Sequence, residues 1–132
     1  MDFKKLKVSL DRVNTLEAIL QVDITPHTAS VQLLFDNFDS GIFSAEKVYH
    51  AMQHLHKFLD SKQIKLLCNC YCLNIRPSGM SISMGGGVKA YLHLMGQHST
   101  ELVNIFDPVD DISLIATYDE QRDFVRQWQR SL

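Results

Sequence analysis

All three cysteines of the chain stand at alternate positions in the stretch LLCNCYCLNI, Leu66 to Ile75. Side chains two residues apart point the same way on a β-strand, so we expect Cys68, Cys70 and Cys72 to line one face. Neighbouring cysteines would then lie too far apart for a disulfide, and the spacing lacks the turn that lets C-x₂₋₄-C converge on zinc. Free cysteine packs as a small buried hydrophobe. The spacing therefore favours thiols packed inside a sheet over a metal site or a redox site.

Before this stretch, apolar residues recur at steps of three or four, which is typical of helices. The first such stripe predicts a helix that Asp2 caps and Pro26 ends, with an apolar face of Phe3, Leu6, Leu10, Val13, Leu16, Leu20 and Ile24. The same spacing predicts a second helix over 31–38, closed by Gly41, and a third over 45–59, capped by Ser44. The first half of the chain is therefore predicted to be helical.

From Ile64 the apolar period changes to two, which predicts strands at about 64–75, 79–84, 88–95 and 101–106. The glycine run Gly85–Gly87 is expected to form a tight hairpin between the second and third of these strands. Thr117 and Glu120 form a capping-box pattern that opens a last helix, with Phe124, Val125 and Trp128 facing inward. The predicted fold class is α+β: N-terminal helices, then an antiparallel β-meander of about four strands and a C-terminal helix, in one domain over 1–132.

The overall charge limits the kinds of partner. The formal net charge is −2, whereas proteins that hold nucleic acid directly usually carry a basic surplus. No apolar run approaches the roughly 20 residues that cross a bilayer, and the N-terminus has no uninterrupted apolar core like that of a signal peptide. We therefore expect a cytoplasmic protein that contacts neither nucleic acid nor membrane directly.

Acidic residues gather between Lys89 and Arg122, where the chain has no lysine or arginine. A surface of this kind steers a basic protein partner, so we predict a partner-binding surface there. Ordinary turn chemistry is the alternative explanation, and the cluster from Asp107 to Asp111 could also hold Mg²⁺ or Ca²⁺, although its spacing is not that of an EF-hand. The predicted partner-binding residues are Asp107, Asp110, Asp111, Tyr118, Asp119 and Glu120.

Patterns for catalysis are absent. His50 and His54 lie four residues apart on a predicted helix and could share a metal, but no HExxH motif accompanies them and their face is otherwise polar. There is no G-x-S-x-G motif, and the glycine run lacks the lysine and the following helix of a phosphate-binding P-loop. His93, His98, Ser99 and Asp107 are close in sequence, which does not make a triad. We predict no enzyme activity, no cofactor and no metal.

The segment GMSISMGGGVKAYLHLMGQHSTELVNIFDP, with its glycine-punctuated hairpin and NIFD strand end, resembles small bacterial immunity proteins of polymorphic toxin and contact-dependent growth inhibition systems. The resemblance lies in the second half of the chain, about 79–132. It implies a cytosolic inhibitor that binds a cognate toxin domain, often a nuclease, and blocks its active site or substrate surface. Nucleases are basic because they hold phosphate backbones, which agrees with a clustered set of carboxylates on the inhibitor.

Two other classes remain open on the sequence. One is a small secretion chaperone or adaptor that binds an unfolded segment, and the other is a small metal-binding enzyme domain.

Overall fold

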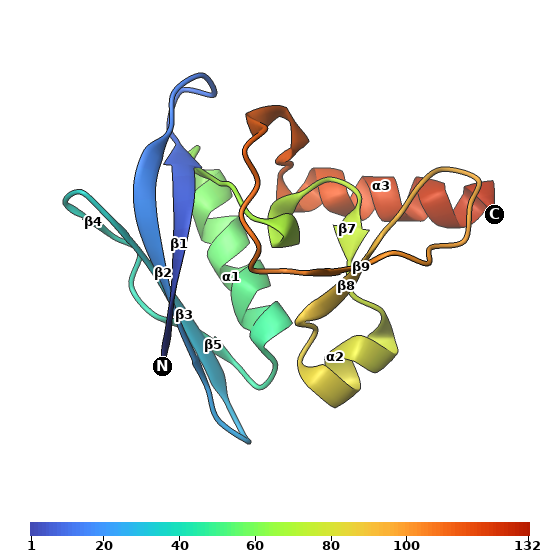
Figure 1. Ribbon diagram of the computed structural model, residues 1–132, viewed down its shortest axis with the longest axis horizontal. Coiled ribbons are helices and arrows are strands. Elements are labelled where there is room, and N and C mark those ends of the chain that lie inside the picture. Colours follow the sequence, from blue (N-terminus) through green and yellow to red (C-terminus); the bar gives the residue numbers. More distant parts are fainter.

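The chain begins with strands rather than helices. The computed structural model describes residues 1–132 and is α+β with antiparallel sheets, as predicted, but its strands come first and number nine (Figure 1). The strands are β1 (Asp2–Ser9), β2 (Leu16–Ile24), β3 (Ala29–Phe35), β4 (Phe38–Asp39), β5 (Phe43–Ala45), β6 (Lys65–Leu66), β7 (Ile75–Arg76), β8 (Lys89–Leu92) and β9 (Leu102–Asn104). The α-helices are α1 (Val48–Ser61), α2 (Gly79–Gly85) and α3 (Tyr118–Ser131), and 3₁₀ turns cover Asn69–Tyr71 and Ile112–Leu114.

The first sheet has the order β4-β3-β2-β1-β6, and β5 also pairs with β3. Each long strand buries alternate residues, for example Ala18, Leu20 and Val22 on β2 and Val31 and Leu33 on β3. The prediction of two N-terminal helices is therefore wrong. Most of the proposed helical stripe is exposed, namely Phe3, Leu10, Val13, Leu16 and Ile24.

A polar loop separates β1 from β2 and breaks the helical pattern. The Asp11 carboxylate accepts hydrogen bonds from the backbone amides of Val13 and Asn14, and Arg12 takes a left-handed φ of 65°. A side chain that captures backbone amides in this way stabilises a turn in competition with a helix. The two flanking segments then pair over seven residues, from Asp2↔Val22 to Val8↔Leu16.

Helix α1 packs its apolar face on the first sheet and confirms the third predicted helix. Val48, Ala51, Met52, Leu55 and Leu59 are buried there. The predicted start is wrong, because Ser44 lies in β5 and the helix begins at Val48 without a side-chain cap. In Figure 1 α1 lies between the first sheet and the rest of the chain, and one cluster of 27 buried residues draws on both sides.

The cysteine stretch is buried but is not a regular strand. It consists of β6, the 3₁₀ turn at Asn69–Tyr71 and β7, with isolated bridges Cys68↔Pro108 and Cys72↔Ile115. All three thiols are free and buried, so the prediction that they pack in the core is confirmed. The prediction that they line one face of a single strand is wrong. Burial raises the pKa of the Cys72 thiol to about 11 and that of the other two thiols further.

The glycine run follows a helix instead of forming a hairpin. The predicted strand over 79–84 is α2: the Ser78 hydroxyl accepts the Ser81 amide at its start, and Gly86 ends it in a left-handed conformation with φ 72°. A capping serine and a left-handed C-cap glycine are helix signals, and here they override the alternating pattern of MSISM. The strands predicted at 88–95 and 101–106 exist as the shorter β8 and β9, in a three-stranded sheet of order β7-β8-β9.

Helix α3 begins with the predicted capping box, in which Thr117 and Glu120 exchange hydrogen bonds. None of its residues is buried, so the inward-facing Phe124, Val125 and Trp128 are only half-buried, and the helix extends away from α1 at the side opposite the first sheet (Figure 1). Polar contacts dock it: the Gln121 side-chain amide donates to the carbonyls of Cys70 and Cys72 at 2.9 and 2.7 Å. No helix combines the length and apolar character that a bilayer crossing requires.

Candidate functional site

The five predicted carboxylates are all exposed, on two separate segments. Asp107, Asp110 and Asp111 lie on the loop after β9, and Asp119 and Glu120 lie in the first turn of α3. Exposure is what a partner-binding role requires.

Some of these carboxylates also have local structural roles. Asp111 accepts hydrogen bonds from the backbone amide and the hydroxyl of Ser113 at 2.9 and 2.7 Å, which lowers its pKa. Glu120 accepts the Thr117 amide, which lowers its pKa too. The carboxylates of Asp107, Asp110 and Asp119 accept no hydrogen bond, although Lys7 Nζ lies 3.8 Å from Asp110. Of these three, Asp107 and Asp110 lie together on the loop after β9.

An open groove of about 560 Å³ runs beside this loop. It lies between Pro108–Asp110 and the start of the first sheet, where Lys5 and Lys7 of β1 and Ile19 of β2 line it. Next to it, β1 pairs with β6 only at Val8 and Ser9, so the edge of β1 from Asp2 to Leu6 has no strand partner. An unpaired edge offers backbone amides and carbonyls to an incoming strand.

No three histidine, cysteine, aspartate or glutamate side chains come together in an arrangement that could hold a metal ion. His50 and His54 are exposed on α1. His56, two residues after His54 and on another face of the helix, is buried: its Nε2 lies 2.9 Å from the Ala116 carbonyl, and its ring stacks on Tyr71 with centroids 3.9 Å apart. Burial lowers the pKa of His56, so the neutral imidazole donates to Ala116. His56 therefore joins α1 to the residues that precede α3.

His93 and Ser99 form a hydrogen bond through Nδ1 and the hydroxyl, and the His93 ring stacks on Trp128. Trp128 in turn donates its indole N–H to the Gln97 carbonyl at 2.9 Å. No carboxylate is hydrogen-bonded to His93, so the arrangement lacks the third member of a triad. These contacts fasten the end of α3 to the loop after β8.

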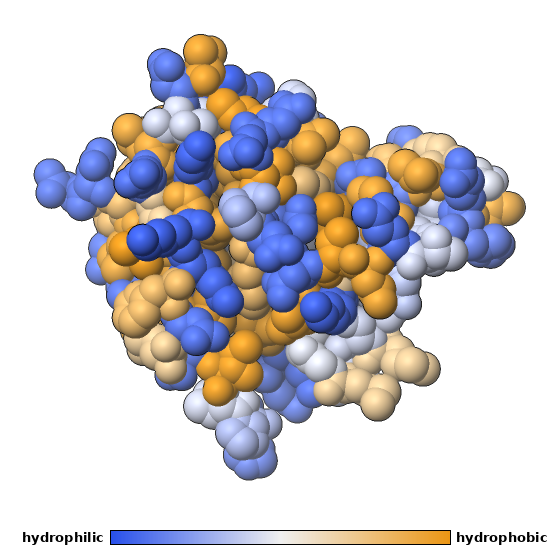
Figure 2. Space-filling view, viewed as in Figure 1, coloured by the Kyte–Doolittle hydropathy of each residue, from blue (hydrophilic) through white to orange (hydrophobic).

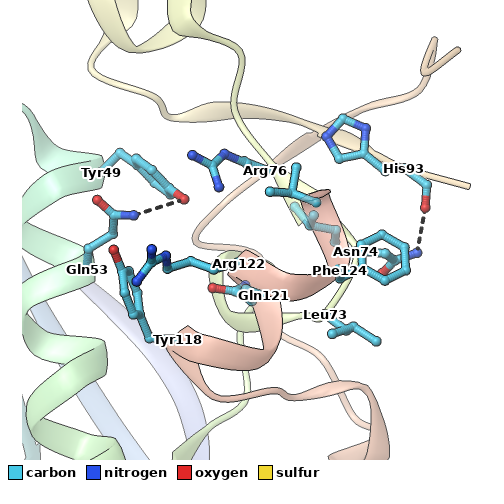
Figure 3. A pocket seen from close by; sticks show the side chains of 12 residues that line it. Tyr49, Gln53, Leu73, Asn74, Arg76, His93, Tyr118, Gln121, Arg122 and Phe124 are labelled. Atoms are coloured by element: carbon cyan, nitrogen blue, oxygen red, sulfur yellow. Dashed lines mark hydrogen bonds between the residues drawn. The ribbon is translucent and has the colours of Figure 1, made fainter. Parts of the chain in front are cut away.

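A second cleft lies between α1, β7 and α3, and its polar side chains converge (Figure 3). Tyr49 and Gln53 come from α1, Arg76 ends β7, and Tyr118 and Arg122 come from the first turns of α3. The inner part, which Tyr49 lines, has a volume of about 10 Å³, whereas the outer part has about 290 Å³ and adds Arg126 and Gln129. Neither part is lined by a carboxylate.

The arginines of this cleft have no partners. The ion pairs of the protein are Lys7–Asp110 and His56–Asp60, so no carboxylate lies within 4.0 Å of Arg76, Arg122 or Arg126. None of the three donates a side-chain hydrogen bond either, although Arg76 is half-buried; Arg122 lies over the Tyr118 ring, 5.8 Å from its centroid.

Tyr49 is almost fully buried, at 5% exposure, and its hydroxyl reaches the cleft. The hydroxyl accepts a hydrogen bond from Gln53 Nε2 at 3.4 Å, and no protein acceptor takes its proton. Burial raises the pKa of Tyr49, so the hydroxyl keeps that proton. Tyr49 is therefore a donor without an acceptor, next to unpaired arginines.

The glycine run fixes the position of Tyr49. The Gly86 carbonyl accepts the Tyr49 amide at 2.9 Å, and a Cβ built on Gly87 would lie 2.6 Å from the Tyr49 Cβ. Gly87 also has a φ of 85°, which favours glycine. The glycines thus allow close packing against α1.

The sequence predictions missed this cleft except for Tyr118, which was assigned to an acidic surface. The structure places Tyr118 among cations instead, with Lys57 Nζ 4.4 Å from its ring centroid. One signal was available: Tyr118, Arg122 and Arg126 recur every four residues, which puts them on one face of the last helix. Neither the family models nor the curated proteins that we compared with the chain include a match.

Proposed function

We propose that this protein is an immunity protein: a cytoplasmic inhibitor that binds a cognate, basic toxin domain, a nuclease, and covers its active site or substrate surface. The observation that carries the proposal is the position of Asp107 and Asp110, exposed and without hydrogen-bond donors, beside the open groove and the unpaired edge of β1. The resemblance in the second half of the chain names the same class.

Each part of this surface supports a different aspect of binding. Carboxylates at the rim raise the association rate with a basic partner through long-range attraction. The groove offers apolar area from Ile19 and Val109, where an anchoring side chain can be excluded from water. The edge of β1 can accept a strand of the partner, and Lys5 and Lys7 can pair with acidic groups that accompany it. Charged and apolar groups together are typical of an interface between proteins.

The test uses the toxin domain encoded beside this chain's gene. Coexpression should rescue growth of cells that produce the domain, and the two purified proteins should form a stable complex. Replacing Asp107 and Asp110 with lysine should slow association several-fold at low salt and leave the melting temperature unchanged, because neither carboxylate accepts a hydrogen bond. Replacing Asp23 and Glu46 with lysine makes the same change in net charge outside the surface and is the matched control.

Two results would refute the proposal. One is that no gene beside this one encodes a toxin whose inhibition of growth the protein relieves. The other is an association rate that the two pairs of substitutions change equally, since the effect would then reflect net charge alone. Dimerisation with binding of an unfolded segment would favour a chaperone or adaptor instead.

A further inference from the structure

A half-buried arginine normally has a partner, because a charged group that leaves water without compensation is costly. This fold otherwise satisfies its polar groups: no buried side-chain nitrogen or oxygen lacks a hydrogen bond. Arg76 departs from that rule: it is half-buried and has no partner, and the exposed Arg122 and Arg126 converge on the same cleft, which has no carboxylate in its lining. Like charges that converge in this way repel one another, which is unfavourable unless an anion is also bound there.

The donors of the cleft have a common orientation. In Figure 3 the guanidinium groups of Arg76 and Arg122 lie on either side of the space in front of Gln53 and the Tyr49 hydroxyl. The buried Tyr49 hydroxyl has a proton that no protein atom accepts. It lines the inner part of the cleft, which holds about 10 Å³, and the outer part of about 290 Å³ begins at Arg76 and Arg122. Tyr49 is an observation independent of the arginines, and it also calls for an acceptor.

We propose that this cleft binds a small molecule that carries a terminal phosphate group in its outer part, with Arg76 and Arg122 on the phosphate oxygens and the Tyr49 hydroxyl linked to one of them through a water in the narrow inner part. Arg126 lies at the outer end, where the remainder of the molecule reaches solvent. The proposal does not depend on the immunity function, because the cleft and the Asp107–Asp110 surface are lined by different residues.

A phosphate fits this donor set better than a carboxylate does. A carboxylate is satisfied by one guanidinium, which binds its two oxygens side by side. Two guanidinium groups and a phenol supply more donors than that, and a terminal phosphate has three oxygens and close to two negative charges. Arginine rather than lysine is also the residue whose planar fork matches phosphate geometry.

The experiment is calorimetric titration of the whole protein with inorganic phosphate and with AMP, at constant ionic strength in chloride. We expect saturable binding of both at one site. Arg76→Gln and Arg122→Gln should each weaken it about 10- to 100-fold, and Tyr49→Phe, which removes only the hydroxyl, by roughly tenfold. Arg130→Gln is the matched control, because it removes the same charge from α3 at a position outside the cleft, and it should leave the affinity unchanged. The circular dichroism melting curve of each variant shows that it is folded.

Three results would overturn the proposal. Absence of saturable binding of phosphate and AMP up to 10 mM would show that the cleft is not a phosphate site. Equal weakening by Arg130→Gln would show attraction to net charge only. If acetate competes with AMP as effectively as phosphate does, the cleft is a carboxylate site. In any of these three cases, a protein that still neutralises its toxin would leave the proposed immunity function standing.

Discussion

Gln121 provides a direct test of how α3 is held, because this helix has no buried residue. The Gln121 side-chain nitrogen donates to two backbone carbonyls, those of Cys70 and Cys72, at 2.9 and 2.7 Å. Gln121→Leu keeps a similar size and removes both hydrogen bonds, so the Cys70 carbonyl loses its partner and the Cys72 carbonyl keeps only the Ile75 amide at 3.4 Å. A net hydrogen bond contributes about 1 kcal/mol, and an acceptor left without a partner costs up to about 3 kcal/mol. We expect a loss of about 2–3 kcal/mol.

The assay follows urea unfolding with two probes. Trp128 is the single tryptophan of the chain and lies on α3, where it stacks on His93, so its fluorescence reports docking of this helix, while far-ultraviolet circular dichroism reports the whole fold. If α3 detaches locally, the fluorescence transition of the variant will precede the circular dichroism transition. A loss of 2–3 kcal/mol corresponds to amide hydrogen exchange in α3 that is about 30- to 150-fold faster.

Two further variants sharpen the result. Gln127→Leu makes the same substitution at an exposed position of α3 that has no hydrogen bond, and it should change stability by less than about 0.5 kcal/mol. Gln121→Glu places an ionised carboxylate against two carbonyl oxygens, so at pH 7.5 it should be at least as unstable as Gln121→Leu. Protonation of the glutamate restores a donor, so the difference in free energy of unfolding between Gln121→Glu and Gln121→Leu should be smaller at pH 5. A Gln121→Leu protein within 0.5 kcal/mol of wild type would refute the reasoning and show that apolar contacts hold α3.

Three other predictions follow from buried groups. Burial lowers the pKa of His56 below 6.5, so the unfolded chain binds the extra proton more readily than the folded protein does. The contribution of His56 to the free energy of unfolding should therefore be complete above pH 6.5 and decline below it. His56→Gln should flatten that part of the pH profile measured by urea unfolding. The Cys72 thiol, with its pKa raised to about 11, should react with a thiol reagent at pH 8 only after denaturation, as should the other two cysteines. Gly87→Ala should lower thermal stability by about 2 kcal/mol or more, since its Cβ would meet Tyr49 at 2.6 Å, whereas Gly41→Ala, which has the φ strain alone with open space around it, should cost about 1 kcal/mol.

The elements that the sequence predicted correctly are those whose signals are local. α3 has its capping box at Thr117, and the apolar face of α1 recurs at helical spacing. The N-terminal strands fit two periods at once: Leu6 and Leu20 belong to the proposed helical stripe and also to the alternating sets that β1 and β2 bury. What decides between the periods is pairing across the sheet, Leu20 with Lys4 on one side and Leu33 on the other, and such contacts are not visible in a local pattern.

The same limit applies to the candidate sites. Asp107 and Asp110 lie close together in sequence, so composition alone indicated a surface there. The cleft combines Tyr49, Arg76 and Arg122, which come from three distant segments and meet only when β7 and α3 pack beside α1. Gly87 belongs to the same arrangement, although in sequence its run favoured a hairpin.

The way in which α3 is docked also bears on the cleft. A helix whose role is to cover the core gains most from buried apolar side chains, yet α3 fully buries none. It is fixed by the Gln121 side-chain amide, by the Tyr118 backbone amide bonded to Asp60 and by the Trp128 indole bonded to the Gln97 carbonyl. Directional hydrogen bonds determine the rotation of a helix about its axis more strictly than apolar contacts do, because they fail when the geometry changes. Rotation is what sets whether Arg122 faces Arg76 or solvent. The polar docking of α3 therefore also holds Arg122 toward the cleft, and Gln121→Leu should weaken phosphate binding in a protein that remains folded, because it releases that rotation.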